Sequence, residues 1–369
     1  MKVLHVLNKL CYSGAEIMYV DAAEELQRLG CELYVVNTAA ELGEYASAFE
    51  KAGYKVLHRP YPKNALAKIA YYREMVDFVK KEKIDVIHTH SSAMKWGMAL
   101  VARIAGIKSI YTFHNCFRSR KLTWPYQTWL RWSAKNLLGC RFQTISDSVY
   151  NNELNYYHNP TTKVYNWFGN KRFYPASESE KEEIRKSLSI PAEALVIISV
   201  GGCSPIKRHD EIIRILPELI AEYPDLIYIH LGKGISTDDE KALAKQLNVD
   251  SHIRFLGNQR DVRKYLIASD IYIMPSRFEG IPITTIEAMA CKIPAILYDV
   301  PGLHDFNSDA KCSLLIPENN QEIISAIRML LSNRDLKKEI VENAYRLVTT
   351  KYFLPKNIKE IYSLYCDRK

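Results

Sequence analysis

Short apolar runs rich in β-branched residues alternate along the chain with amphipathic stretches. Near the N-terminus, residues 2–8 predict a strand, and residues 15–30 predict a helix that ends at Gly30. Further strands are expected at 32–38, 55–60, 85–90 and 109–114. Because helical patterns separate several of these runs, the order predicts parallel strands with helices on both faces of a sheet.

A second series of the same kind follows the polar segment 176–192. Strands are expected at 194–202, 226–234, 253–258, 270–276 and 293–299, with a helix at 210–223 between the first two. Pro355 separates a last helical pattern from the one before it. Ligands of open parallel sheets bind at the carboxyl ends of the strands, so two such domains facing each other predict a binding cleft.

We therefore expect a doubly wound α/β protein of two Rossmann-like domains. Their predicted bounds are 1–172 and 173–350, followed by a helical segment, 351–369, that packs back towards the first domain. The length of 369 residues suits two domains, and 47% hydrophobic with 25% charged residues is a globular composition. A formal net charge of +8 allows an acidic ligand or an anionic membrane surface, but it does not select nucleic acid.

The eight cysteines are scattered and form no Cys-x-x-Cys pair. This usage predicts reduced thiols in a cytosol, without a disulfide framework or a zinc site. The first residues, MKVLHVLNKL, are too short and interrupted for a signal sequence. No apolar run reaches the roughly 20 residues that cross a bilayer. The sequence thus predicts a cytoplasmic protein whose membrane contact, if any, is peripheral.

The first strand is followed by the turn NKLCYSGAE, residues 8–16, which contains one glycine, Gly14. A dinucleotide fingerprint needs three glycines, so a dehydrogenase is disfavoured. A single glycine still lets a phosphate or sugar approach the helix N-terminus. The alternative is that Ser13 or Gly14 merely caps the helix.

The corresponding turn of the second series is VGGCSPIKRHDE, residues 200–211. Lys207 and Arg208 come just before a helix, where cations oppose the helix dipole, so an anionic ligand such as a diphosphate would account for them. The alternative is a solvated pair of basic side chains.

Two glutamates stand eight positions apart in SRFEGIPITTIEAMACKIP, residues 276–294. Thr284 and Glu287 fit a capping box, which is a sufficient structural explanation for Glu287. Glu279 has no comparable explanation, because it lies in a loop next to Gly280. Ionised carboxylates accept strongly from hydroxyls, so carboxylates beside a phosphate-binding helix end describe a site for a nucleotide sugar.

This segment resembles the signature of the retaining glycosyltransferases of family four, the glycosyl transferases group one, which have the GT-B fold. The glutamate pair with seven residues between, the following Ala-Met-Ala and the Pro-Ala-Ile strand all match. The resemblance continues in SGAE (13–16), DVIHTHS (85–91), TFHN (112–115), the VGG stretch with its lysine, FLG (255–257) and the terminal helix. It covers nearly the whole chain.

The resemblance implies a role for individual residues. Glu279 would hold the donor sugar near its reacting carbon, Lys207 would stabilise the leaving diphosphate, and His90 would complete the catalytic set. His114 would contact the acceptor, although each histidine could equally be structural. The implied donor-binding residues are Gly14, Arg208, Gly280, Ile281, Pro282, Thr284, Thr285 and Glu287, the last of these holding the ribose.

The sequence departs from the family pattern at a few positions. Gly202 stands where the family often has arginine, and Arg208 would supply the missing positive charge. DAKCSLL (309–315) lacks the usual glycine, and LHD (303–305) replaces a Pro-Glu pair. These changes concern the recognition of the base and the acceptor, and not the fold.

The implied activity is retaining, metal-independent hexosyl transfer from a nucleotide-diphosphate sugar, with UDP the commonest donor nucleotide among relatives. The acceptor would be a growing surface polysaccharide, lipopolysaccharide or lipid-linked glycan, and neither a cofactor nor a metal is expected. Two alternatives remain: a nucleotide-sugar epimerase on the same scaffold, and a binding module without catalysis.

A basic and aromatic stretch bears on the acceptor. Residues 86–146 contain no Asp or Glu but nine Lys and Arg residues. Within them, FRSRKLTWPYQTWLRWSAK, residues 117–135, interleaves cations with three tryptophans. The pattern suits an anionic inner membrane surface. The alternatives are a groove for single-stranded nucleic acid, which no accompanying motif supports, and tryptophans packed in the core.

Overall fold

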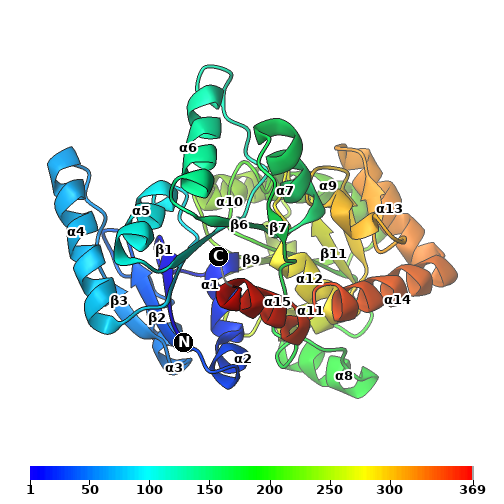
Figure 1. The fold of residues 1–369 in the computed structure, drawn as a ribbon. Helices are drawn as coiled ribbons and strands as arrows, with labels where there is room; N and C mark the ends of the chain where they lie inside the picture. Colours follow the sequence, from blue (N-terminus) through cyan, green and yellow to red (C-terminus); the bar gives the residue numbers. More distant parts are fainter. Residues whose placement is uncertain (368–369) are drawn as a thin grey trace. The chain divides into compact units, whose positions relative to one another are not determined.

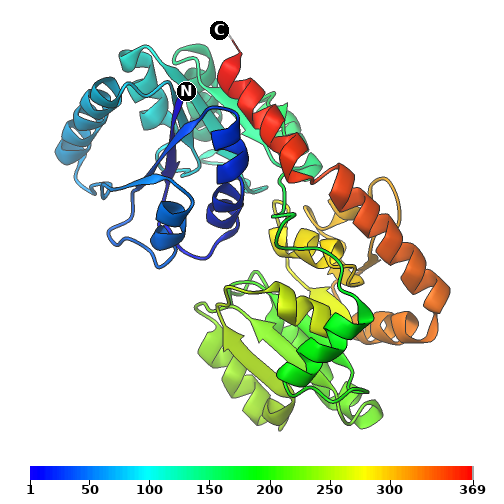
Figure 2. The same ribbon diagram turned by 90° about the horizontal axis from the view of Figure 1, so that it is seen from below.

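The computed structural model describes residues 1–367 and divides them into two compact units. The first is Met1–Asn166 together with the last helix, α15 (Leu354–Cys366), and the second is Trp167–Phe353 (Figures 1 and 2). The unit boundaries thus lie at 166/167 and 353/354, where the sequence suggested 172/173 and 350/351.

The first unit contains a parallel sheet of seven strands among its described residues, in the order β3-β2-β1-β4-β5-β6-β7. Its strands are β1 (Lys2–Leu7), β2 (Glu32–Asn37), β3 (Lys55–His58), β4 (Val86–Thr89), β5 (Lys108–Phe113), β6 (Arg141–Thr144) and β7 (Thr162–Lys163). Its other helices are α1 (Gly14–Asp21), α2 (Ala23–Arg28), α3 (Ala46–Lys51), α4 (Ala65–Glu82), α5 (Lys95–Ala105), α6 (Trp124–Asn136) and α7 (Asp147–Asn151), the last continuing into a π-helical turn, Asn152–Tyr156.

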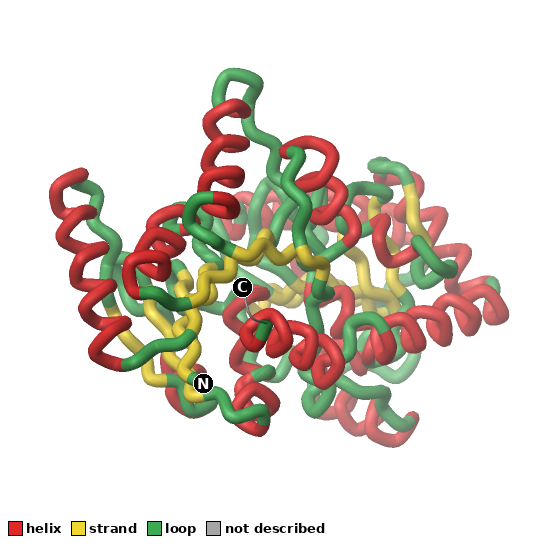
Figure 3. Tube along the Cα trace, in the orientation of Figure 1, coloured by secondary structure: helices red, strands yellow, loops and turns green. Residues whose placement is uncertain are grey.

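The second unit contains a parallel sheet of six strands in the order β10-β9-β8-β11-β12-β13. Its strands are β8 (Val196–Val200), β9 (Ile227–Leu231), β10 (Ile253–Gly257), β11 (Ile271–Met274), β12 (Ala295–Tyr298) and β13 (Leu314–Ile316). Its helices are α8 (Glu178–Ser187), α9 (His209–Glu222), α10 (Thr237–Gln246), α11 (Arg263–Ala268), α12 (Ile283–Ala290), α13 (Asn320–Ser332) and α14 (Arg334–Thr350). Figure 3 shows the helices packed around the strands.

The prediction of two doubly wound α/β domains is confirmed. Every residue of β8, β11 and β12 is buried, as expected for parallel strands covered by helices on both faces. The helix expected at 15–30 is two shorter helices that meet at Ala22. Three short strands, β6, β7 and β13, were not anticipated, because two to four residues carry too little of a period-two pattern to be recognised.

Helix α15 packs on the sheet of the first unit although it follows the whole second unit in sequence. Its Tyr365 hydroxyl bonds to His88 Nδ1 of β4 at 2.7 Å, and Lys108 Nζ donates to the Tyr365 carbonyl at 2.6 Å. Asn357 Nδ2 donates to the Asn166 carbonyl at 3.0 Å. Within residues 1–367, no helix has both the length and the apolar character that crossing a bilayer requires.

Candidate functional site

The strand order of the second sheet reverses direction between β8 and β11. β8 pairs with β9 on one side and with β11 on the other, so the connections that leave β8 and β11 run to opposite faces of the sheet. In doubly wound sheets the loops at such a reversal separate and leave room for a ligand at the carboxyl ends of the strands. The loops here are 201–208 after β8 and 275–282 after β11, and both were singled out in the sequence.

These two loops are joined by hydrogen bonds. The Arg277 amide donates to the Ile206 carbonyl at 2.9 Å. One residue further in the first loop, Lys207 Nζ donates to Glu279 Oε1 at 2.6 Å, with 22% and 12% of the two side chains exposed. The fold therefore places the predicted cation and the predicted loop carboxylate in direct contact, 72 positions apart in sequence.

A third loop supports the backbone of Glu279. The Glu279 amide donates to the Pro301 carbonyl at 2.9 Å, in the loop that follows β12. The next residue, Gly302, has φ +83°, and a Cβ built on it would lie 2.3 Å from the Glu279 carbonyl oxygen. Only glycine fits this approach without displacing the backbone of Glu279.

Helix α12 begins directly after the loop 275–282, and the predicted capping box does not form. The helix starts at Ile283, its N-cap is Pro282 with φ −75° and ψ 123°, and no side chain caps it. Thr284 is inside the helix, and its hydroxyl bonds to the Val200 carbonyl at 3.1 Å. The capping prediction was wrong because packing against β8 captures the Thr284 hydroxyl.

The two threonines face the sheet and not the helix end. Tyr272 OH bonds to Thr284 Oγ1 at 3.0 Å and to Thr285 Oγ1 at 3.2 Å.

The first turn of an α-helix has amide groups without an intrahelical partner, and they attract anions. Glu287 lies one turn further along and is 4% exposed. With its capping role removed, Glu287 has lost the structural explanation that the sequence offered.

Arg208 occupies the N-cap of α9 with a left-handed φ of 54°. Its guanidinium forms ion pairs with Glu211 and Glu318 and lies 5.2 Å from the Tyr298 ring centre. A phosphate could contact this group only by sharing or replacing these carboxylates. Lys207 is therefore the more direct partner for a diphosphate, and the role of Arg208 stays a prediction.

The first unit repeats the arrangement at the reversal between β1 and β4. Gly14 is exposed at the first residue of α1, in the connection after β1. His90 and His114 follow β4 and β5, and His90 Nδ1 bonds to His114 Nε2 at 3.1 Å. Burial lowers the pKa of His114 to about 4 and that of His90 well below its ordinary value, so both rings are neutral near pH 7.

Sequence reasoning missed two histidines that continue this row. His5 Nδ1 bonds to His90 Nε2 at 3.2 Å, and the His88 ring contacts the rings of both His5 and His90. Both belong to strands, where a polar ring inside an apolar run was the available signal. His5, His88 and His90 could hold a metal ion by proximity, but both nitrogens of His88 are already bonded at 2.7 Å, to Tyr365 and Thr112.

Glu16 is a further residue that the sequence did not single out by itself. It is 4% exposed in the first turn of α1 and accepts from the Ser13 hydroxyl. Burial raises its pKa to about 7. The predicted turn residues Ser13 and Gly14 thus lie beside a carboxyl group that can be protonated at neutral pH.

Comparison with protein families agrees with this geometry. A model described as Glycosyltransferase Family 4 matches residues 12–201, and one described as Glycosyl transferases group 1 matches residues 180–347. The chain belongs to glycosyltransferase family 4. The two matches together run from the turn before α1 into α14, so they include both loops of the second unit.

The relatives of this family 4 member differ in the length of the segment that matches it and in sequence identity. An uncharacterised glycosyltransferase of Haemophilus influenzae is 30% identical over 170 residues, which are 46% of this chain and 48% of the relative. The chain thus spans about half the length of that protein. The UDP-Gal:alpha-D-GlcNAc-diphosphoundecaprenol alpha-1,3-galactosyltransferase of Escherichia coli is 26% identical over 304 residues, 78% of this chain and 77% of that one.

Solved structures confirm the predicted fold of the family 4 chain. The Anabaena protein HepE, in complex with UDP and glucose, superposes with a TM-score of 0.84 at 19% identity over 98% of both chains. A glycosyltransferase from Rickettsia africae superposes with a TM-score of 0.83 at 20% identity, over 99% of this chain and 97% of that one. The architecture is therefore GT-B.

Proposed function

We propose that the protein transfers a sugar from a nucleotide-diphosphate donor to a hydroxyl of a glycan or lipid-linked acceptor, with retention at the anomeric carbon. One observation carries the proposal. The Lys207–Glu279 pair lies at the strand reversal of the second sheet, next to the first turn of α12. A cation, a carboxylate and a helix N-terminus together match the phosphates and hydroxyls of a nucleotide sugar.

The donor is held by three kinds of contact. The diphosphate takes the positive charge of Lys207 and the amide groups at the start of α12, from the stretch Gly280–Thr285. Glu279 accepts from hydroxyls of the transferred sugar, and Glu287 accepts from those of the ribose. Glu279 is an ion-pair partner of Lys207, so a diphosphate that binds the lysine shares it with this carboxylate or replaces it.

The reaction breaks the bond between the anomeric carbon and the diphosphate oxygen. A new bond forms from the acceptor oxygen to the same carbon on the same face, and the acceptor proton passes to the departing phosphate. Negative charge grows on that phosphate in an oxocarbenium-like transition state. Lys207 and the α12 amides stabilise this charge, where each preorganised donor is worth about 3 kcal/mol.

His90 and His114 belong to the acceptor side of the proposal. Both are neutral rings whose nitrogens act as donors or acceptors of hydrogen bonds and not as charges. His90 is held between His5 and His114, which fixes the plane of its ring. Because both ring nitrogens of His90 are thereby bonded, the proposed contact with a sugar hydroxyl falls to His114, whose ring His90 holds in place.

Two relatives support UDP as the donor nucleotide and a lipid-linked acceptor. HepE holds UDP and glucose, and the Escherichia coli relative is named for a UDP-galactose donor and a diphosphoundecaprenol-linked acceptor. The proposed donor is therefore a UDP-hexose, and the proposed acceptor a growing surface polysaccharide or its lipid-linked precursor.

Thermal unfolding with free nucleotides, followed by product analysis, tests this proposal. UDP at 100 times its Kd is expected to add about 2.7 kcal/mol to the free energy of unfolding, more than GDP or ADP at the same concentration. A UDP-hexose supplied with lipid-linked saccharides should then release UDP and extend the acceptor. Failure of every nucleotide to raise the melting temperature contradicts the proposal.

The same assay separates the alternatives. An epimerase changes the sugar of the nucleotide without releasing UDP, and a binding module raises the melting temperature without turning over any donor. The anomeric configuration of the product, read by NMR coupling constants, tests retention independently of the acceptor. An inverted product would be consistent with transferase activity but would contradict the same-face mechanism.

Much of the basic-aromatic stretch 117–135 is exposed on the first unit, although Arg131 within it is buried and paired with Glu153. Helix α6 and the loop before it project away from the sheet in Figure 1. Trp129 and Trp132 are 51% and 53% exposed, and Leu122 in the loop is 94% exposed. The interpretation that these tryptophans pack in the core is wrong for Trp129 and Trp132, and we propose that this surface meets the headgroup region of an anionic membrane.

Liposome co-sedimentation tests the surface. Vesicles containing anionic lipid are expected to retain more protein than neutral vesicles, and the double variant Trp129→Ser/Trp132→Ser should lower that retention about tenfold. Leu66→Ser is the matched control, because Leu66 is an exposed apolar residue of α4 in the same unit. Equal recovery of the wild type with neutral and anionic vesicles would argue against membrane docking.

A further inference from the structure

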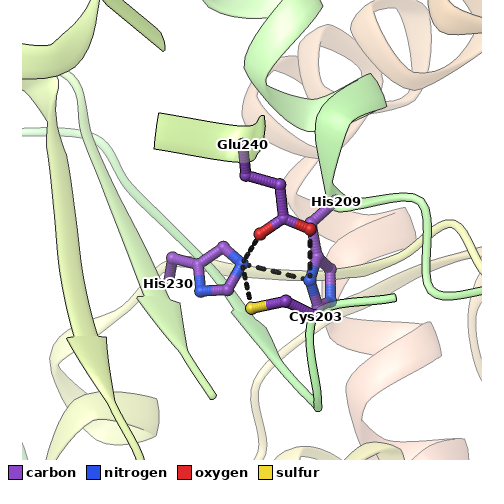
Figure 4. Close-up of side chains that lie close together, drawn as sticks. All are labelled: Cys203, His209, His230 and Glu240. Carbon is purple, nitrogen blue, oxygen red and sulfur yellow. Dashed lines mark hydrogen bonds and ion pairs between the residues drawn. The ribbon is translucent and has the colours of Figure 1, made fainter. Parts of the chain in front are cut away.

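Four potential metal ligands converge inside the second unit, and two of them flank the part of the loop that holds Lys207. They are Cys203 in the loop after β8, His209 at the first residue of α9, His230 on β9 and Glu240 on α10. None of the four is more than 3% exposed. Figure 4 shows them pointing towards one another from four separate segments of chain.

Their ligand atoms lie close enough together to surround one metal ion. His230 Nε2 lies 3.0 Å from His209 Nδ1, 3.1 Å from Glu240 Oε2 and 3.8 Å from Cys203 Sγ. His209 Nδ1 lies 3.7 Å from Glu240 Oε1, and one ligand atom from each of the four residues falls within 4.8 Å of all the others. Tetrahedral zinc with bonds of about 2.0–2.3 Å separates its ligands by roughly 3.3–3.7 Å.

Hydrogen bonding alone does not account for the arrangement. An imidazole nitrogen holds either one proton or one lone pair, so His230 Nε2 satisfies one strong partner at a time although three surround it. Among the described residues, Glu240 Oε2 has no hydrogen bond of good geometry although His230 Nε2 lies 3.1 Å away, and His209 Nε2 and His230 Nδ1 have no partner either. A carboxylate removed from water needs a cationic partner, and no Lys or Arg is paired with Glu240 in this part of the chain.

We propose that these four side chains bind one Zn²⁺ ion through Cys203 Sγ, His209 Nδ1, His230 Nε2 and the Glu240 carboxylate. Sulfur, imidazole and carboxylate are all accepted zinc ligands, and four protein ligands give a closed, structural site. Binding breaks the Cys203 S–H bond, and the proton leaves to solvent as the Zn–S bond forms. The imidazoles ligate as neutral rings, with their protons on His209 Nε2 and His230 Nδ1.

The four side chains connect the loop that carries Lys207 to the rest of the second unit. Cys203 and His209 are the two ends of the loop that carries Lys207, and His230 and Glu240 fix those ends to β9 and α10. The ion would hold this loop at both ends without itself contacting the nucleotide sugar. The zinc prediction is independent of the proposed function, because none of the four ligands is among the residues proposed to bind donor or acceptor.

Metal analysis of the purified protein tests the site. Protein expressed with added Zn²⁺ and passed through a desalting column is expected to hold about one zinc per chain, measured by inductively coupled plasma mass spectrometry. Cys203→Ser and His230→Gln should each reduce the content at least tenfold. Cys312→Ser is the matched control, since Cys312 is equally buried in the same unit but lies outside the cluster.

A second measurement keeps the inference testable if a variant fails to fold. Wild-type protein stripped with a chelator should lose at least about 4 °C of melting temperature and regain it with Zn²⁺. Co²⁺ should bind the stripped protein with a near-ultraviolet thiolate charge-transfer band that Cys312→Ser keeps and Cys203→Ser lacks. Metal-free wild type with an unchanged melting temperature in chelator and in Zn²⁺ would overturn the site, as would an equal cobalt band in both variants.

Discussion

Replacement of Glu279 by glutamine is expected to lower sugar transfer about 10²–10³-fold while leaving UDP binding intact or tighter. The amide keeps the shape of the side chain but removes the negative charge that we propose faces the transferred sugar. It also releases Lys207 from its 2.6 Å ion pair, so the lysine becomes fully available to the diphosphate. Turnover and UDP affinity therefore move in opposite directions, which a general loss of structure would not produce.

Two measurements on matched variants check this result. Turnover is read as UDP release with a UDP-hexose and a lipid-linked acceptor, and affinity as the UDP-induced shift in melting temperature. Glu342→Gln is the control, because Glu342 forms an ion pair with Lys292 in the same unit on an exposed face of α14. Wild-type turnover in Glu279→Gln would remove Glu279 from the mechanism.

Replacement of Gly302 by alanine is expected to damage both stability and activity. The new Cβ would lie 2.3 Å from the Glu279 carbonyl oxygen and 2.6 Å from its carbonyl carbon, and backbone atoms cannot rotate out of the way. The left-handed φ of +83° adds about 1–2 kcal/mol of strain, and the overpacking about 1–3 kcal/mol. Displacement of Glu279 by about 1 Å should lower turnover about 10²-fold.

Gly30→Ala isolates the cost of the backbone conformation. Gly30 has a similar φ of +85°, but a Cβ built there meets no heavy atom within 4 Å. Because of the backbone strain, the variant should lose only about 1–2 kcal/mol of unfolding free energy, and it should keep its turnover. Chemical unfolding and the UDP-release assay measure the two quantities. Equal effects of the two alanines would show that the contact with Glu279 does not matter.

The sequence predicted the fold well because its signals are local. Runs of β-branched residues and the helical period between them located most strands to within a few residues, and they gave the two α/β domains. The same local signals failed where an element was very short, as in β7, or where contacts across the sheet decided the outcome. Thr284 matched a capping box by spacing, but its hydroxyl bonds to the Val200 carbonyl because α12 packs against β8.

The candidate site was predicted in part for the same reason. Spacing drew attention to Lys207 and Glu279 separately, and the family resemblance assigned their roles. Their contact depends on the pairing of β8 with β11, which no local pattern reveals. Arg208 looked equivalent to Lys207 in sequence, yet Glu211 and Glu318 are its partners in the structure.

The sequence by itself indicated some of the residues that we propose carry chemistry, such as Lys207 and Glu279, and the kind of element in which each lies. Only the tertiary structure decided which of them meet. Cys203, His209, His230 and Glu240 have no spacing typical of a metal site, because a loop, a strand and two helices each supply one ligand. Secondary structure follows from interactions over a few residues, whereas a site assembled from separate elements follows from the order in which strands pair.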